Sequence, residues 1–133
     1  MALTSEQKEF FEANGYLRYE KVLTDQELEL LRNRIEAIIA GKLTHVPDRF
    51  IQLEADFKDE GIGDTPRLDA VRKVTHLTYF DDMFEETCRK PEIVDVIEDL
   101  IGPNLKLYTD QLMMKPRFNG TVTGWHQDSV AWP

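Results

Sequence analysis

The sequence is poor in cysteine, and it has no long apolar run. Its single cysteine among 133 residues excludes an internal disulfide and agrees with a reducing, cytoplasmic location. No apolar stretch approaches the roughly 18 residues that a membrane span requires. The first residues carry no basic region followed by an apolar one, so we expect no secretory signal.

Basic side chains are also scarce, at 16 Lys and Arg against 25 Asp and Glu, and the formal net charge is −9. Binding to nucleic acid depends on clustered cations, so we expect neither a nucleic-acid partner nor a membrane partner. A small-molecule substrate remains open, even an anionic one, because such a ligand responds to the local field and not to the total charge. The length suits one domain with one core and leaves the oligomeric state open.

The single cysteine, Cys88, lies in an acidic stretch that includes Glu85 and Glu86. Nearby carboxylates disfavour the thiolate that a nucleophilic cysteine needs. We therefore interpret Cys88 as a structural residue.

Two helix starts are marked by capping boxes, in which a Thr is followed three residues later by Gln or Glu. Thr4 with Gln7 predicts the first helix, which should end at Gly15. Thr24 with Glu27 predicts a second. Apolar residues recur at helical spacing along that second helix, which should end at Gly41: Leu28, Leu31, Ile35, Ile38 and Ile39.

Two further helices are predicted in the second half of the chain. Asp81 or Asp82 should cap a short one, and Pro91 suits the first position of a longer one. Gly102 followed by Pro103 should end the latter. Its apolar stripe has helical spacing: Ile93, Val96, Ile97, Leu100 and Ile101.

Strands are expected over residues 16–22 and 104–115, while residues 71–77 read as either a strand or a loop. Over 104–115, odd-numbered residues share one face and even-numbered ones the other. Both faces are mixed in polarity, which suits a sheet covered on one side and facing a site on the other. Residues 43–66 combine charges with glycines and are predicted to be a long surface loop with at most one short element, either a lid or disordered.

The triplet His126-Gln127-Asp128 is the strongest candidate for chemistry. If this stretch is extended, alternate side chains point the same way, so an imidazole nitrogen and a carboxylate oxygen converge. That pair suits a divalent metal such as Fe(II), Mn(II) or Zn(II). Such triplets are common, and an ordinary polar strand end is the alternative.

The order of these elements resembles the N-terminal half of the phytanoyl-CoA dioxygenase family of Fe(II)- and 2-oxoglutarate-dependent oxygenases. The similarity covers nearly all of residues 1–133, which we interpret as the N-terminal part of a single domain. Its most specific parts are residues 100–104 (Leu-Ile-Gly-Pro-Asn), 114–116 (Met-Lys-Pro) and the His-Gln-Asp triplet. The resemblance implies an α+β fold: a double-stranded β-helix, a jelly-roll and cupin-like barrel with N-terminal helices packed outside, here truncated.

The resemblance also implies Fe(II), the cosubstrate 2-oxoglutarate and, as an additional reductant, ascorbate. His126 and Asp128 match the first His and the carboxylate of the family's metal site. Gln111 and Lys73 match residues that contact 2-oxoglutarate in the family. The alternative for Gln111 is an ordinary polar residue of the sheet, and the alternative for Lys73 is a solvated surface cation. Trp125 is expected to pack against the barrel wall. The implied activity is hydroxylation of a small organic or acyl substrate. Asp128 favours hydroxylation over halogenation, because halogenating relatives have a small residue there.

The family's second metal His and the Arg that pairs with 2-oxoglutarate lie farther downstream, and the sequence ends before either. His45 and His76 lie in the wrong place to replace the missing ligand. We therefore expect a truncated chain that is inactive alone, with the activity belonging to its full-length parent. Two alternatives stay open: a non-catalytic jelly-roll binding module or inactive fragment, and a metal-dependent isomerase or cupin-like binder.

Overall fold

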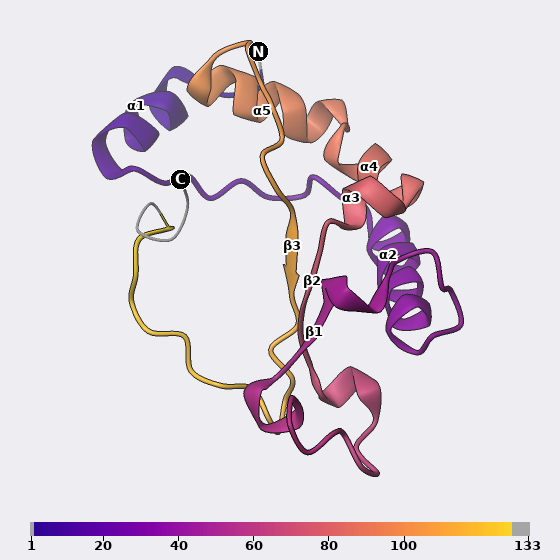
Figure 1. Ribbon diagram of the computed structural model, residues 1–133. Coiled ribbons are helices and arrows are strands. Elements are labelled where there is room, and N and C mark those ends of the chain that lie inside the picture. The colour runs from indigo at the N-terminus through magenta and orange to yellow at the C-terminus, as the bar shows by residue number, and fades with distance from the viewer. Residues whose placement is uncertain (1, 129–133) are drawn as a thin grey trace.

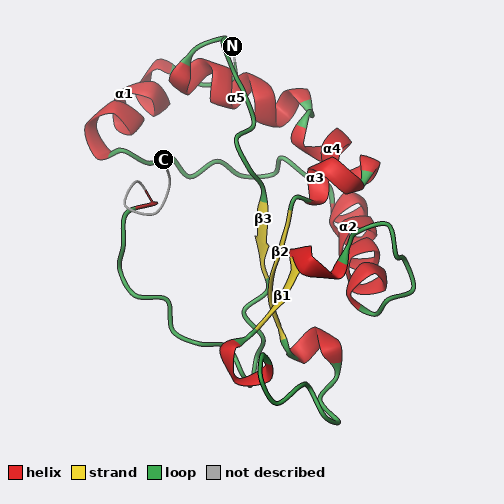
Figure 2. Ribbon diagram, in the orientation of Figure 1, coloured by secondary structure: helices red, strands yellow, loops and turns green. Residues whose placement is uncertain are grey.

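The computed structural model describes residues 2–128, which form helices around a small antiparallel sheet (Figure 1, Figure 2). The sheet has the order β1-β2-β3, and both pairs are antiparallel. In Figure 1, α2 lies on one side of the sheet, and the chain after β3 turns below the sheet and runs back up the opposite side. The elements are α1 (Ser5–Asn14), α2 (Asp25–Ile39), β1 (Ile51–Leu53), β2 (Val71–Thr75), α3 (Leu77–Phe80), α4 (Asp82–Cys88), α5 (Pro91–Ile101) and β3 (Gln111–Met113).

The helices begin where the capping residues predict. In α1 the Thr4 side chain accepts a hydrogen bond from the Gln7 N–H, and the Gln7 side chain accepts one from the Thr4 N–H. The same reciprocal pair opens α2. Asp81 caps α4 by accepting from the backbone N–H of Met83, and Pro91 occupies the first position of α5. These predictions are confirmed because capping depends only on residues a few positions apart.

The core lies between α2 and one face of the sheet. α2 buries its last apolar residues there, as the helical spacing predicts, and β2 supplies the two most buried strand residues, Val71 and Val74. Removing this apolar surface from water is what holds the helix on the sheet. The buried cluster consists of Ile35, Ile38, Ile39, Val46, Ile51, Val71, Val74 and Leu77.

An irregularity in the β1–β2 pairing decides which side chains face away from α2. The register shifts between Gln52 and Leu53, so Gln52 is paired with Lys73 and Leu53 with Val71. Arg72, which lies between Val71 and Lys73, is skipped in this register. A bulge of this kind interrupts the strict alternation of a strand. Arg72 and Lys73, although adjacent, both line the cavity described below.

Two strand predictions need correction. Residues 16–22 form no strand, and within 104–115 only Gln111–Met113 pairs as β3. The predicted loop over 43–66 was allowed one short strand or helix, and it contains β1, which is only three residues long and is stabilised by its pairing with β2. The alternation over 109–115 is confirmed: odd-numbered residues line the cavity, while Leu112 and Met114 pack against the core.

The described residues form a three-stranded sheet and do not close a double-stranded β-helix. The apolar stripe of α5 is only partly covered, with Val96 buried and Ile97 and Ile101 exposed. Over residues 2–128, no helix has both the length and the apolar character to cross a bilayer.

The N-terminus is fastened to α5 through one carboxylate. Asp99 accepts a 2.7 Å hydrogen bond from Lys8 Nζ and accepts the backbone N–H groups of Ala2 and Leu3 at 2.7 and 2.9 Å. The Lys8 ammonium, followed by the Leu3 N–H, lowers the pKa of Asp99 from 3.8 to about 2. This contact therefore stabilises the fold fully above pH 3.8 and is lost as the pH falls through about 2.

We expect Lys8→Met to raise the pKa of Asp99 toward its ordinary value of 3.8, because the neighbouring positive charge is gone. An NMR titration of the Asp99 carboxyl carbon measures this directly. Lys58→Met, which removes a distant exposed lysine, serves as the control and should leave the titration unchanged. An Asp99 midpoint that does not move in Lys8→Met would contradict the ion pair.

Candidate functional site

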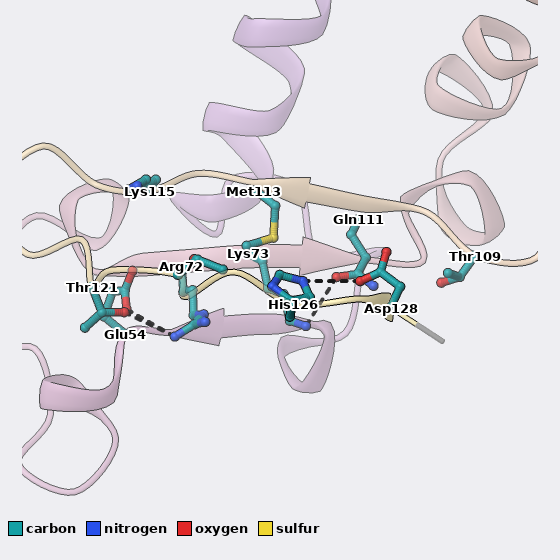
Figure 3. A pocket seen from close by; sticks show the side chains of 11 residues that line it. Glu54, Arg72, Lys73, Thr109, Gln111, Met113, Lys115, Thr121, His126 and Asp128 are labelled. Atoms are coloured by element: carbon teal, nitrogen blue, oxygen red, sulfur yellow. Dashed lines mark hydrogen bonds and ion pairs between the residues drawn. The ribbon is translucent and has the colours of Figure 1, made fainter. Parts of the chain in front are cut away.

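A cavity of about 740 Å³ lies on the face of the sheet that is turned away from α2. Its walls come from β2, from β3, from the segment after β3 and from the residue that follows β1 (Figure 3). Two groups of side chains can be followed in Figure 3. One consists of Lys73, Gln111, His126 and Asp128, and the other of Glu54, Arg72 and Thr121.

Lys73 and Gln111 meet across the β2–β3 pair. Lys73 is opposite Met113 and Gln111 is opposite Thr75 in the register, so both side chains project from neighbouring strands. Lys73 Nζ donates to Gln111 Oε1 at 3.3 Å. Within residues 2–128 Lys73 has no carboxylate partner, so its positive charge is available to an anion that enters the cavity.

His126 and Asp128 lie side by side, with 3.3 Å between His126 Nε2 and Asp128 Oδ1. His126 Nδ1 lies 2.8 Å from the carbonyl oxygen of Gly124, which can only accept, so Nδ1 carries the hydrogen. A neutral imidazole then presents a lone pair on Nε2 toward the carboxylate. Two acceptors face each other, and a proton or a metal cation between them satisfies both.

The donor set fits a divalent first-row metal. Two ligand atoms about 2.1 Å from one ion and roughly at right angles lie about 3.0 Å apart, close to the observed separation. The Gly124 carbonyl holds the ring in the tautomer that a metal ligand needs, a support that ligating histidines commonly have. Imidazole together with carboxylate suits Fe(II), Mn(II) and Zn(II).

The segment that carries this pair differs from its predicted form. Residues 125–128 are not a strand, and a bend at Trp125 brings the His126 ring back to Gly124. His126 and Asp128 are more than half exposed. The expectation that Trp125 packs against a barrel wall is wrong for residues 2–128, since its side chain is fully exposed and the described sheet does not extend to it.

The described part of the chain offers His126 and Asp128 as two candidate ligands and no third. It holds no group of three His, Cys, Asp or Glu side chains placed for one metal ion. His45 is hydrogen-bonded to Asp81, and His76 packs against the Phe50 ring with 5.0 Å between ring centroids. Neither histidine lines the cavity, in agreement with the expectation that they cannot replace a missing ligand.

Seven of the eleven residues that line the cavity were not predicted as site residues, among them Glu54, Arg72, Lys115 and Thr121. Glu54 fell in a predicted loop, and Arg72 would point away from Lys73 in a regular strand. Lys115 lies on the odd-numbered face of 104–115, which was a signal that could have found it. Thr121 has no sequence signal, because its role depends on contacts with residues far away in the chain.

Cys88 lies apart from this cavity. Its side chain is exposed, but partial desolvation by the surrounding residues raises the pKa of its thiol, and the negative charge of Asp110 adds to the effect. Both causes keep the thiol protonated, as expected for a structural cysteine.

Comparisons with known proteins agree with the character of this site. A profile of the family described as phytanoyl-CoA dioxygenase (PhyH) matches residues 11–133. The chain is 32% identical over 139 residues to a probable phytanoyl-CoA dioxygenase of Caenorhabditis elegans, covering 98% of this chain and 43% of the relative. It is 27% identical over 124 residues to the peroxisomal phytanoyl-CoA dioxygenase of Rattus norvegicus, covering 93% and 36%.

A further relative is the ectoine dioxygenase of Bordetella parapertussis, which is 24% identical over 131 residues, with 98% of this chain and 39% of the relative covered. No solved structure matches the chain. The chain thus spans less than half the length of each of these relatives. Because the family profile covers nearly all of its residues, the chain belongs to the phytanoyl-CoA dioxygenase family.

Proposed function

We propose that the chain is the N-terminal part of an Fe(II)- and 2-oxoglutarate-dependent dioxygenase that hydroxylates a small organic or acyl substrate. The activity belongs to the full-length parent. The observation that carries this proposal is the pair His126 Nε2 and Asp128 Oδ1, 3.3 Å apart, in the same cavity as Lys73 and Gln111. When bound, Fe(II) with O₂ and 2-oxoglutarate supplies the oxidation that inserts oxygen into a C–H bond, releasing succinate and CO₂.

The chain's own residues bind and orient in this proposal. His126 and Asp128 hold the metal through Nε2 and a carboxylate oxygen, with the ring fixed by Gly124. The Lys73 ammonium pairs with a carboxylate of 2-oxoglutarate, and the Gln111 amide provides both a donor and an acceptor beside it. Charge pairing of this kind is among the stronger hydrogen bonds that a protein offers an anion.

One observation favours the alternative of a non-catalytic binding module for the chain alone. Two ligands, both more than half exposed, leave a bound metal largely to water, and residues 2–128 contain no third ligand. The isolated 133-residue chain is therefore proposed to be inactive. A small-molecule partner and the cytoplasmic location suggested by the lone cysteine stay predictions, as does the exact substrate.

The cosubstrate assignment predicts a specific kinetic change. In the full-length parent, Gln111→Ala should raise the apparent KM for 2-oxoglutarate about tenfold, because a hydrogen bond to a charged group is worth about 1.5 kcal/mol or more. The KM for the hydroxylated substrate should change much less. Succinate release at varied 2-oxoglutarate concentration measures both.

Gln52→Ala is the matched control, since Gln52 is an exposed glutamine on β1 that does not line the cavity. An unchanged 2-oxoglutarate dependence in Gln111→Ala would remove that residue from the site. Absence of any 2-oxoglutarate-dependent succinate release by the full-length parent would reject the proposed function itself.

A further inference from the structure

Glu54 is a buried carboxylate with no part in the proposed chemistry. It follows β1, its side chain is only 2% exposed, and it opens onto the cavity. An ionised carboxylate is costly to bury unless it is hydrogen-bonded and paired. The partners of Glu54 therefore show what the fold uses it for.

Those partners come from two other parts of the chain. The hydroxyl of Thr121 donates to Glu54 Oε2 at 2.8 Å. The same oxygen of Thr121 accepts from Arg72 Nη1 at 3.2 Å, while Arg72 and Glu54 are 3.8 Å apart. Thr121 thus bridges an acid and a base that are themselves only loosely in contact, and its side chain joins the segment after β3 to both β1 and β2.

The Thr121 bridge lies in the segment after β3, between a tight turn and His126. The chain leaves β3, turns tightly at Pro116 to Gly120, and reaches Thr121 five residues before His126. Asn119 also donates to the Asp69 carbonyl at 3.2 Å, on the near side of Thr121. From residue 122 to 128 the only described hydrogen bond or ion pair besides the His126–Asp128 contact is local, from His126 to Gly124.

We infer that Thr121 is a positioning residue, which uses Glu54 and Arg72 as its anchor and holds the residue 122–128 segment so that His126 and Asp128 face the sheet. The placement of the metal pair then depends on a polar bridge and not on strand pairing. Only the part of the inference that concerns metal binding rests on the proposed function. The anchoring of residues 122–128 can be measured without any metal.

Thr121→Val is the direct test, since valine keeps the branched shape and removes the hydroxyl. In the metal-free 133-residue chain, we expect the ¹⁵N order parameters of residues 122–128 to fall to about 0.6 or below, the range of flexible backbone. Thr121→Ser keeps the hydroxyl, so the order parameters of residues 122–128 should stay at their wild-type values. Val122→Thr, at an adjacent side chain that is 90% exposed, is the matched control and should leave them unchanged.

Gly120→Ala provides a second route to the same disturbance without touching the hydroxyl. A Cβ at Gly120 would lie 2.7 Å from the Pro116 carbonyl oxygen, so the turn must open and move Thr121 away from its partners. The same loss of order over 122–128 is expected. This variant carries the test if Thr121→Val does not fold.

Mn(II) titration supplies the second readout. Supporting residues of metal sites typically contribute about 10- to 100-fold in affinity, and we expect Thr121→Val to weaken Mn(II) binding about tenfold. Order parameters that stay unchanged in Thr121→Val and in Gly120→Ala would overturn the inference. So would Mn(II) that binds at His126 in the wild type and binds with equal affinity in Thr121→Val. Loss of order in both variants, with no Mn(II) bound by the wild type at His126, would support the anchor and reject the proposed metal site.

Discussion

Replacing Asp81 with alanine is expected to lower the free energy of unfolding by about 2–4 kcal/mol, because a buried ion pair loses one partner. The Asp81 side chain is fully buried. Its Oδ2 accepts from Arg34 Nε and from His45 Nε2, both at 2.7 Å, and its Oδ1 accepts from the Met83 N–H. One carboxylate therefore ties α2, the loop after α2 and the start of α4 together.

Chemical denaturation of the two proteins measures this difference. Asp59→Ala, at an exposed aspartate of the loop after β1, is the control and should change the stability by less than about 0.5 kcal/mol. A loss below about 1 kcal/mol in Asp81→Ala would show that the cluster adds little.

The same carboxylate predicts how stability depends on pH. Burial acts to raise the pKa of Asp81, but the hydrogen bonds from Arg34 and His45 outweigh it and hold that pKa below its ordinary value of 3.8. The stabilisation is therefore present above pH 3.8 and is lost as the pH falls through the lowered pKa. The stability difference between wild type and Asp81→Ala should shrink over that acidic range.

His126→Ala is expected to weaken the binding of a divalent metal at least about 100-fold, since even supporting residues of metal sites contribute up to that much. The physical reason is that the proposed site has only two candidate ligands within residues 2–128, so one substitution removes half of them. The matched control is His76→Asn. His76 has a φ of 60°, and asparagine tolerates this left-handed conformation.

The helices were predictable from sequence because their signals are local. The capping pairs Thr4–Gln7 and Thr24–Glu27 are three residues apart and act before any tertiary contact forms. The alternation over 109–115 was equally local, and it correctly placed Gln111 on the cavity face.

The remaining features depend on partners that are distant in sequence. β1 is three residues long and exists through its pairing with β2, so a short element was expected within residues 43–66 but neither its position nor its type could be predicted. Arg72 reaches the cavity because the register between β1 and β2 shifts at its position. Trp125 was expected to pack against the barrel wall, but its side chain is exposed. Packing depends on neighbouring segments that the local sequence does not reveal.

In the proposed site, His126 and Asp128 hold one metal ion in the cavity that Gln111 lines. Titration of the ¹⁵N-labelled chain with Mn(II), followed by amide spectra, tests it most directly, because a paramagnetic ion broadens only the signals near it. We predict selective broadening at residues 124–128 and at Gln111, its loss in His126→Ala, and its retention in His76→Asn. Broadening confined to the acidic surface of α5, and identical in wild type and His126→Ala, would contradict the account.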